Sequence, residues 1–171
     1  MRTLKILFLL VLLLLGLPLL GQSEEYLIKI KFSEARLFLF SDREETIADF
    51  PIGLPMLDPK VVPINGEVMR IERNPYWYPT EGIRKAYFKK HNKELSVVVE
   101  PGDPRNAMGV AKIIIAFKTP GVHPLIRIHG TNEDESVGQR ISRGCIRMFN
   151  KDILVLIEII DGKQTRVLFE K

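Results

Sequence analysis

The stretch LIRIHGTNEDESVGQRISRGCIRMFNKD, residues 125–152, determines how this 171-residue chain is interpreted. It opens as an apolar run that favours a β-strand and ends at His129, and it contains Cys145, the one cysteine of the chain. Gly130 follows the histidine and Gly144 precedes the cysteine, at positions where the backbone must turn or come close to a bound group. A cysteine and a histidine in this pattern predict a Cys–His nucleophile pair.

The N-terminal residues predict export. Arg2 and Lys5 precede an apolar run, and small residues follow up to Ser23, as in a secretory signal. We expect residues 1–23 to be a signal peptide cleaved after Ser23 or an uncleaved membrane anchor, since the apolar part at 6–20 is shorter than the roughly 20 residues that span a bilayer comfortably. Residues 24–171 then form one domain in the periplasm or cell wall. Exported proteins usually pair their cysteines or lack them, so a lone cysteine there suggests chemistry.

The charge balance argues against a nucleic acid as partner. The chain has a net charge of +4, and without Arg2 and Lys5 it keeps 23 basic against 21 acidic residues. No arginine-rich stripe or interleaved aromatic platform accompanies them. One cysteine and three scattered histidines also lack the spacing of a zinc site, so we expect neither a metal nor a cofactor.

Short β-branched and aromatic runs predict a mainly β domain. The expected strands cover residues 26–32, 37–40, 46–52, 68–71, 96–100, 111–117, 125–128 and 165–169. Turn-forming residues, among them Asn65-Gly66, separate them. One helix is expected after the cysteine: Asn150 can cap it, Asp152 sits near its positive end, and apolar residues recur at helical spacing until Asp161-Gly162 stops it.

The segment 73–93 has the weakest pattern, and we expect it to be irregular. It begins with prolines and aromatic residues and ends in a basic run from Arg84 to Lys93. A long irregular insert in a compact β domain is often a lid or a binding loop, and a packed surface loop fits equally well. The basic run is expected to be a solvated loop, with a contact surface for an anionic polymer as the alternative.

A thiol nucleophile needs a thiolate, an oriented base and donors for the oxyanion. His129 ends a strand-like run, where its side chain can face a cleft, and the Gly130 carbonyl is an acceptor for its second ring nitrogen. Gly144 lets the backbone turn and present N–H groups toward a bound carbonyl. A simpler interpretation fits the same spacing: Cys145 is a buried small hydrophobe and His129 a hydrogen-bonded residue at a strand end.

The fuller string resembles the signature of the L,D-transpeptidases of the YkuD type, at the spacing of that family. The matching positions are His129-Gly130-Thr131-Asn132, Gly138 and Ser142-x-Gly144-Cys145-Ile146-Arg147-Met148-x-Asn150-x-Asp152. More weakly, Pro51-Ile52-Gly53 and Asn106-Ala107-Met108-Gly109 are similar to other elements of that family. The segment Val62-Pro63-Ile64-Asn65-Gly66 departs from its Thr-Pro-x-Gly element, because it lacks the threonine and has an extra residue. Arg143 stands where many members have histidine, and we do not expect it to be catalytic.

This resemblance implies a fold and an activity. The fold would be the β-sandwich or barrel-like catalytic fold of that family, over residues 24–171, with one helix following the cysteine loop. The activity would be peptidoglycan L,D-transpeptidation, in which the cysteine attacks a stem tetrapeptide at its L-centre and releases D-alanine. The acyl group would pass to an amine on a second stem, to a protein, to a D-amino acid or to water. Stem peptides are thus the implied partners, and a carbapenem is the implied covalent inhibitor.

The resemblance also assigns roles to the residues of the catalytic site. Cys145 would be the nucleophile, and His129 the general base and later the acid. The Gly130 carbonyl would orient His129. The backbone N–H groups of Gly144 and Cys145 would hold the oxyanion.

Four further residues are candidate substrate contacts. Arg147 would steer the anionic stem or brace the cysteine loop, and a salt bridge to Asp152 or another neighbour is its alternative role. Ser142 and Asn132 are expected to shape loops first and to contact the substrate second. Trp77 would wall the cleft or pack in the core or on the surface.

Two other functions stay open at this point. A sortase-like cysteine transpeptidase would use His91 as its base and Arg166 as its arginine, but the sortase string Thr-Leu-x-Thr-Cys is absent from this sequence. A non-catalytic module that binds the cell envelope would leave Cys145 merely packed. His91 and His123 are otherwise expected to be surface or loop residues.

Overall fold

The computed structural model describes residues 24–56, 62–117, 120, 123 and 125–171, so the expected leader at 1–23 lies outside the described residues. The described strands, in chain order, are β1 (Glu25–Lys31), β2 (Arg36–Phe40), β3 (Thr46–Pro51), β4 (Leu54–Pro55), β5 (Ile64–Arg73), β6 (Ala111–Phe117), β7 (Leu125–His129), β8 (Arg140–Ser142), β9 (Ile146–Arg147) and β10 (Gln164–Glu170). The described helices are α2 (Glu81–His91), the short 3₁₀-helix η1 (Asp134–Ser136) and α3 (Asn150–Ile160). Within these ranges no helix combines the length and the apolar character needed to cross a membrane.

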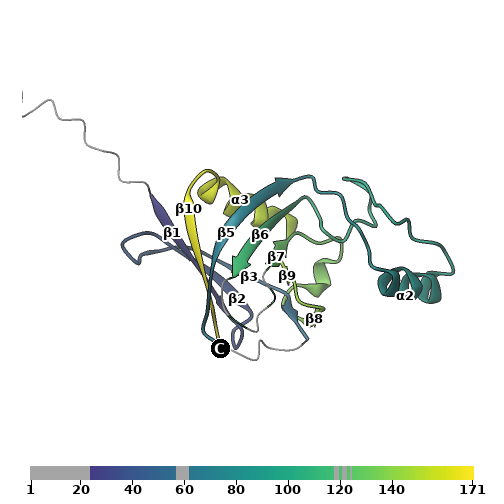
Figure 1. The fold of residues 1–171 in the computed structure, drawn as a ribbon, viewed down its shortest axis with the longest axis horizontal. Helices are drawn as coiled ribbons and strands as arrows, with labels where there is room; N and C mark the ends of the chain where they lie inside the picture. Colours follow the sequence, from purple (N-terminus) through teal and green to yellow (C-terminus); the bar gives the residue numbers. More distant parts are fainter. Residues whose placement is uncertain (1–23, 57–61, 118–119, 121–122, 124) are drawn as a thin grey trace, which may run out of the picture.

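One large curled sheet organises the molecule (Figure 1). Its strand order is β3-β2-β1-β10-β5-β6-β7-β9, and β4 and β8 form a second, two-stranded sheet. β1 pairs with β10 in parallel, so the first and last strands of the described chain lie side by side and run in the same direction. β7 pairs in parallel with β9, while the strands between β10 and β7 are antiparallel. The prediction of a mainly β fold with a helix after the cysteine loop is confirmed.

Period-two alternation in the strands builds the core. In β6, Ile113 and Ile115 are fully buried, and in β1 the buried pair is Ile28 and Ile30. Phe169 packs in the same core, edge-to-face against two further phenylalanines, Phe32 and Phe117. Each buried aromatic or branched aliphatic side chain stabilises the fold by about 1.5–3 kcal/mol relative to its exposed state.

The helix α3 covers the sheet on β6, as the sequence predicts, but its N-terminus differs from the prediction. Its buried residues, Ile153, Leu156, Ile157 and Ile160, recur at the spacing of one helix face. Phe149 is the N-cap residue and makes no side-chain cap, while Asn150 is the first residue of the helix. The expected cap by Asn150 is therefore wrong, and its side chain is used elsewhere.

Two other expectations about the strands are wrong. The run 96–100 forms no strand, and of it only Val99 pairs, in an isolated bridge with Trp77. Asn65-Gly66 forms no turn, because both residues lie inside β5, which is longer than the predicted 68–71. Gly66 is required there because a Cβ would come within 2.7 Å of the Phe117 ring and 2.8 Å of the Ala116 carbonyl oxygen.

The segment 73–93 is not irregular, because it contains α2. Thr80 caps this helix by accepting a hydrogen bond from the Ile83 N–H, Glu81 lies in its first turn, and Asn92 ends it in a left-handed conformation. These cap signals are present in the sequence, but no residue of α2 is buried, so it lacks the apolar stripe that predicts a helix. Residues 74–110, called the arm below, carry α2 away from the sheet (Figure 1). The base of the arm is closed by the Asn74 N–H, which donates to the Val110 carbonyl at 2.7 Å.

Candidate active site

His129 is the last residue of β7 and is held on both sides by neighbouring strands. Its carbonyl accepts from the Met148 N–H at 2.9 Å, and the following N–H, that of Gly130, donates to the Ala111 carbonyl at 3.0 Å. The residue is 2% exposed. Its Nδ1 lies 2.6 Å from the Gly130 carbonyl oxygen. A carbonyl only accepts, so Nδ1 carries the hydrogen and the neutral ring keeps its lone pair on Nε2.

Burial sets the charge of this imidazole. Desolvation, together with the positive charges of Arg147 and Arg127, lowers the pKa of His129 from 6.5 to about 4, although backbone hydrogen bonds to Gly130 and Ala107 oppose the shift. The ring is therefore neutral at pH 7. A neutral imidazole with a free Nε2 can accept a proton, which a general base requires.

Cys145 lies immediately before β9, on the same side of the sheet as His129. Ile128 pairs with Ile146, and His129 pairs with Arg147. Because side chains alternate along a strand and Ile128 and Ile146 both point into the core, Cys145 and His129 both point to the opposite face. The sulfur and the ring thus face one space.

The resting state of the thiol differs from the sequence-based expectation of a preformed thiolate. Burial raises the pKa of Cys145 above 9.0, and the charges of Arg127 and Arg147, with hydrogen bonds from Arg127, oppose this rise only in part. With the pKa of His129 near 4, the neutral thiol and neutral imidazole are the stable pair at pH 7. Any reaction at this sulfur would therefore have to remove the thiol proton as it proceeds.

Ser142 shapes the loop that carries the cysteine. It is 5% exposed, and its Oγ donates to the Cys145 carbonyl at 2.5 Å and accepts from the Gly144 N–H at 3.3 Å. Gly144 has a φ of 132°, which side chains disfavour, so glycine suits this turn. The loop is closed on itself before it enters β9.

A groove of about 570 Å³ opens over Cys145 and His129. One wall comes from the sheet and the cysteine loop, with Ser142, Arg143 and Arg147. The other wall comes from the arm, which contributes Trp77, Ile83, Ala86, Tyr87, Lys90, His91, Pro104, Arg105, Ala107 and Met108. The arm therefore borders the groove. This position favours the interpretation of segment 73–93 as a binding loop over its interpretation as a packed surface loop.

The structure brings six of the eight predicted side-chain and loop positions to this groove. His129, Cys145, Arg147, Ser142, Asn132 and Trp77 line it, while the glycines Gly130 and Gly144 lie beside His129 and Cys145. The Asn132 side chain donates to the Pro104 carbonyl at 3.0 Å, so it also ties the His129 loop to the arm. Trp77 is half-buried, with its backbone paired to Val99.

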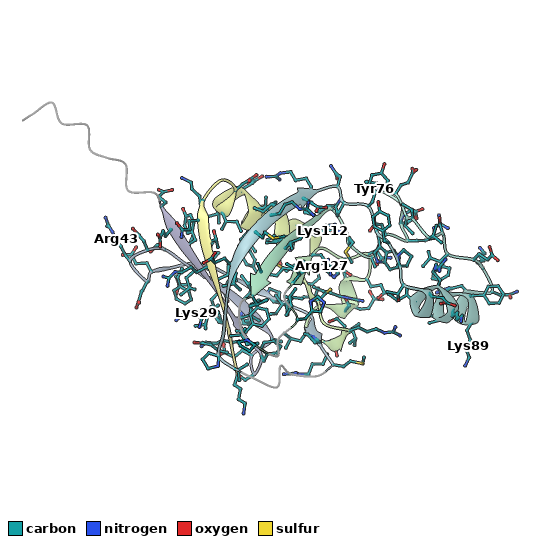
Figure 2. All side chains as sticks on the ribbon, viewed as in Figure 1. Lys29, Arg43, Tyr76, Lys89, Lys112 and Arg127 are labelled. Atoms are coloured by element: carbon teal, nitrogen blue, oxygen red, sulfur yellow. The ribbon has the colours of Figure 1, made fainter. Side chains whose placement is uncertain are left out.

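Sequence reasoning missed a residue beside Cys145 and several residues of the groove. Arg127 touches the cysteine through hydrogen bonds and charge, and it lies on the sheet near Lys112 in Figure 2. Its position two residues before His129 on a strand, and so on the same face, is the signal that could have found it. Tyr87 and His91 reach the groove from α2 and stack on each other with ring centroids 4.4 Å apart.

Positive charge dominates the groove. Arg147 pairs with Glu133, Nη1 to Oε2 at 3.2 Å, so its predicted salt bridge goes to this neighbour. Its Nε is buried and has no hydrogen-bond partner in the structure. Lys90, Arg105 and Arg143 add cationic groups to the lining, and Glu133 is the one carboxylate among its described residues. Among the described residues, no group of three or more His, Cys, Asp or Glu is placed to hold a metal ion.

Comparison with known proteins identifies the family. The L,D-transpeptidase catalytic domain, YkuD, matches residues 25–168. The probable L,D-transpeptidase YbiS of Escherichia coli K12 is 35% identical over 144 residues, which are 83% of this chain and 44% of YbiS. The chain therefore belongs to the L,D-transpeptidase catalytic domain family, a family of enzymes. It spans less than half the length of YbiS.

Solved structures share the fold. The LD transpeptidase LdtMt1 in complex with imipenem superposes with a TM-score of 0.53 at 12% identity, over 86% of this chain and 59% of that one. L,D-transpeptidase 3 from Mycobacterium tuberculosis, in complex with a faropenem-derived adduct, gives a TM-score of 0.53 at 11% identity, over 86% and 61%. At these low identities, the similarity shows a shared fold and nothing about activity.

Proposed function

We propose that this protein is a peptidoglycan L,D-transpeptidase in which Cys145 attacks a stem tetrapeptide at its L-centre and releases D-alanine. The acyl group then passes to an amine, on a second stem, a protein or a D-amino acid, or to water. The observation that carries the proposal is the shared groove: Cys145 and His129 face one space, and the Gly130 carbonyl holds Nδ1 of the ring. Family membership supplies the substrate class.

Proton transfer in the proposed reaction follows from the neutral resting pair. As the substrate carbonyl arrives, Nε2 of His129 takes the thiol proton and the sulfur forms a bond to the carbonyl carbon. The carbonyl electrons move onto oxygen. When the tetrahedral intermediate collapses, the bond to the D-alanine nitrogen breaks, and His129 returns its proton to that leaving amine. A thioester on Cys145 remains.

The second half of the reaction reverses these steps. The incoming amine loses a proton to His129 and attacks the thioester carbonyl. The carbon–sulfur bond breaks, and the sulfur recovers the proton. Water in place of the amine makes the reaction a hydrolysis.

The oxyanion would be held by main-chain N–H groups of Gly144 and Cys145. The Gly144 N–H donates to Ser142 Oγ at 3.3 Å, and it would exchange this long bond for the oxyanion. Gly130 would orient His129 through its carbonyl, at 2.6 Å from Nδ1. Removing one such oxyanion donor typically costs about 10²–10³ in rate.

The cationic lining of the groove fits an anionic stem. Arg147 lines the groove, and its guanidinium charge would attract a carboxylate of the donor. Asn132, Ser142 and Trp77 border the same space and would contact the peptide. Because peptidoglycan lies outside the cytoplasmic membrane, residues 1–23 would serve as the export signal or anchor, and 24–171 as the catalytic domain.

The test is release of D-alanine from a purified disaccharide tetrapeptide, with muropeptide analysis of treated cell wall to identify the acceptor. We expect the protein to release D-alanine and Cys145→Ala to release none. His129→Gln should cut turnover by about 10²-fold or more, since it removes the base. His91→Gln is the matched control, because His91 lines the same groove but is exposed.

The result also separates the alternatives. Full turnover in His129→Gln with none in His91→Gln would favour sortase-like chemistry, although Arg166, its arginine, lies on β10 and does not line the groove. A binding module would show no D-alanine release and a Cys145 thiol indifferent to alkylation in the folded protein.

A further inference from the structure

Asn150 sits where the cysteine loop enters α3, and its side chain reaches across to the His129 strand instead of capping the helix. Its Oδ1 accepts from the Thr131 N–H at 3.1 Å and from the Val110 N–H at 3.2 Å. Its Nδ2 donates to the Thr131 carbonyl at 2.8 Å. Two donors and one acceptor around the amide determine which end is oxygen and which is nitrogen.

One of these bonds acts on the acceptor of His129. The Thr131 N–H and the Gly130 carbonyl belong to the same peptide group, which is planar and trans. In a trans peptide the N–H and the C=O point in opposite directions. Asn150 Oδ1 holds the N–H end of this plane, so the C=O end points back toward Nδ1 of His129, 2.6 Å away.

Two glycines make room for this contact. A Cβ at Gly130 would lie 2.2 Å from Asn150 Oδ1, and a Cβ at Gly109 would also lie 2.2 Å from it. Gly109 has a φ of 62°, so it suits the position for its backbone conformation as well. The backbone on both sides is therefore adapted to the asparagine side chain.

The carbonyl that Asn150 orients decides which tautomer His129 adopts. With the acceptor at Nδ1, the hydrogen stays on Nδ1 and the lone pair stays on Nε2, toward the groove. If the peptide plane were free to turn, Nδ1 would lose its acceptor. The Nε2–H tautomer would then be populated, and its ring could not take a proton from the thiol at Nε2.

We propose that Asn150 is a positioning residue for His129: by anchoring the Gly130–Thr131 peptide, it keeps the imidazole in the tautomer that can act as the base. The catalytic consequence rests on the proposed function, whereas the tautomer itself does not. Asn150 is not among the residues that line the groove, and of its three hydrogen bonds the one from the Thr131 N–H belongs to the peptide whose carbonyl meets His129.

The first measurement is the ring tautomer, read from the imidazole ¹⁵N resonances of the full chain at pH 7.5. The chain has three histidines, so His91→Gln and His123→Gln assign the signals of His129. We expect one tautomer, Nδ1–H, in the unsubstituted protein and a mixture of both in Asn150→Ala. Asn150→Asp keeps an oxygen for the Thr131 N–H and should keep the single tautomer.

A matched control separates positioning from general loss of stability. Ile157→Val removes one methylene from a buried position of α3, seven residues beyond Asn150, at a cost of about 0.5–1.5 kcal/mol. It should keep the single tautomer. If Asn150→Ala does not fold, Asn150→Ser takes its place, since serine keeps a polar group in the first turn but is too short to reach Thr131.

The second measurement is the kinetics of D-alanine release. Asn150→Ala should lower kcat by about ten- to hundredfold with KM little changed, and Asn150→Asp should recover part of the loss. A single Nδ1–H tautomer in Asn150→Ala or Asn150→Ser would overturn the proposal, and so would equal kcat losses in Asn150→Ala and Ile157→Val. If neither the unsubstituted protein nor any variant releases D-alanine, the proposed function is wrong. The tautomer comparison then still decides the role of Asn150.

Discussion

Buried His129 should make the fold sensitive to mild acid, and His129→Gln should remove that sensitivity. The unfolded chain binds a proton on this residue below its ordinary pKa of 6.5, while the folded chain does so only near pH 4. The neutral form is thus favoured in the fold. The associated stability is fully present above pH 6.5 and is lost as the pH falls toward 4.

The magnitude follows from the size of the pKa shift. A change from 6.5 to about 4 corresponds to about 3 kcal/mol, at roughly 1.4 kcal/mol per pH unit. For a domain of this size that is roughly 6–12 °C in Tm. Ion-paired carboxylates such as Glu72 and Asp103, whose pKa values lie below their ordinary range, also lose stability toward the acid end of this window, but they do so equally in both proteins, so the comparison with His129→Gln isolates the histidine.

The assay is urea unfolding of the protein and of His129→Gln at intervals from pH 7.5 to 4.5. We expect the free energy of unfolding of the unsubstituted protein to fall more steeply, so that the difference between the two proteins shrinks or reverses toward pH 4.5. His123→Gln, at an exposed position, serves as the control and should follow the unsubstituted protein. Parallel pH dependences for the protein and His129→Gln would refute the reasoning, because they would mean that the ring is not desolvated.

Three further predictions concern the groove and the backbone that supports it. A carbapenem should acylate Cys145, and unmodified protein in the mass spectrum after long incubation would contradict the proposed chemistry. Arg127→Gln removes a positive charge and hydrogen bonds that lower the pKa of Cys145. Iodoacetamide should therefore alkylate the thiol more slowly at pH 7, and the pH at which alkylation accelerates should rise. An unchanged pH profile would exclude an effect of Arg127 on the pKa of the thiol. Gly109→Ala should destabilise the fold by more than about 2 kcal/mol in urea unfolding, because its Cβ would lie 2.2 Å from Asn150 Oδ1. The control is Gly138→Ala, at a φ of 84° with open space around it, which should cost only about 1–2 kcal/mol. Equal losses in the two variants would show that the protein relieves the close contact at Gly109.

Much of the fold can be predicted from local pattern. The strands around Ile28, Ile113 and Val167 have β-branched residues whose alternation matches one buried face, and α3 has an apolar stripe at helical spacing. The helix α2 was missed because its residues contact a groove and solvent, so burial leaves no apolar stripe in its sequence. The strand predicted at 96–100 failed because Val97 and Val98 are exposed on the arm, where no neighbouring strand accepts their backbone.

The candidate site also has a part that can be predicted from the sequence and a part that cannot. The order and spacing of His129, Gly130, Gly144 and Cys145 are visible in the sequence, because a tight loop needs glycine wherever it occurs. The position of Arg127 beside the sulfur depends on the register between β7 and β9, which involves residues far apart along the chain. The neutral state of the thiol depends on burial, which no spacing reveals.

The sequence by itself determined the strand-rich class, the helix after the cysteine loop and the two residues proposed to carry the chemistry, because these depend on side-chain type and on short-range periodicity. Tertiary structure alone decided that the arm borders the groove, that the thiol and imidazole rest uncharged, and that Asn150 holds a peptide plane in place of capping a helix. These properties arise from desolvation and from hydrogen bonds between segments distant in the chain. Such interactions exist only when the strands have paired and the helix has packed.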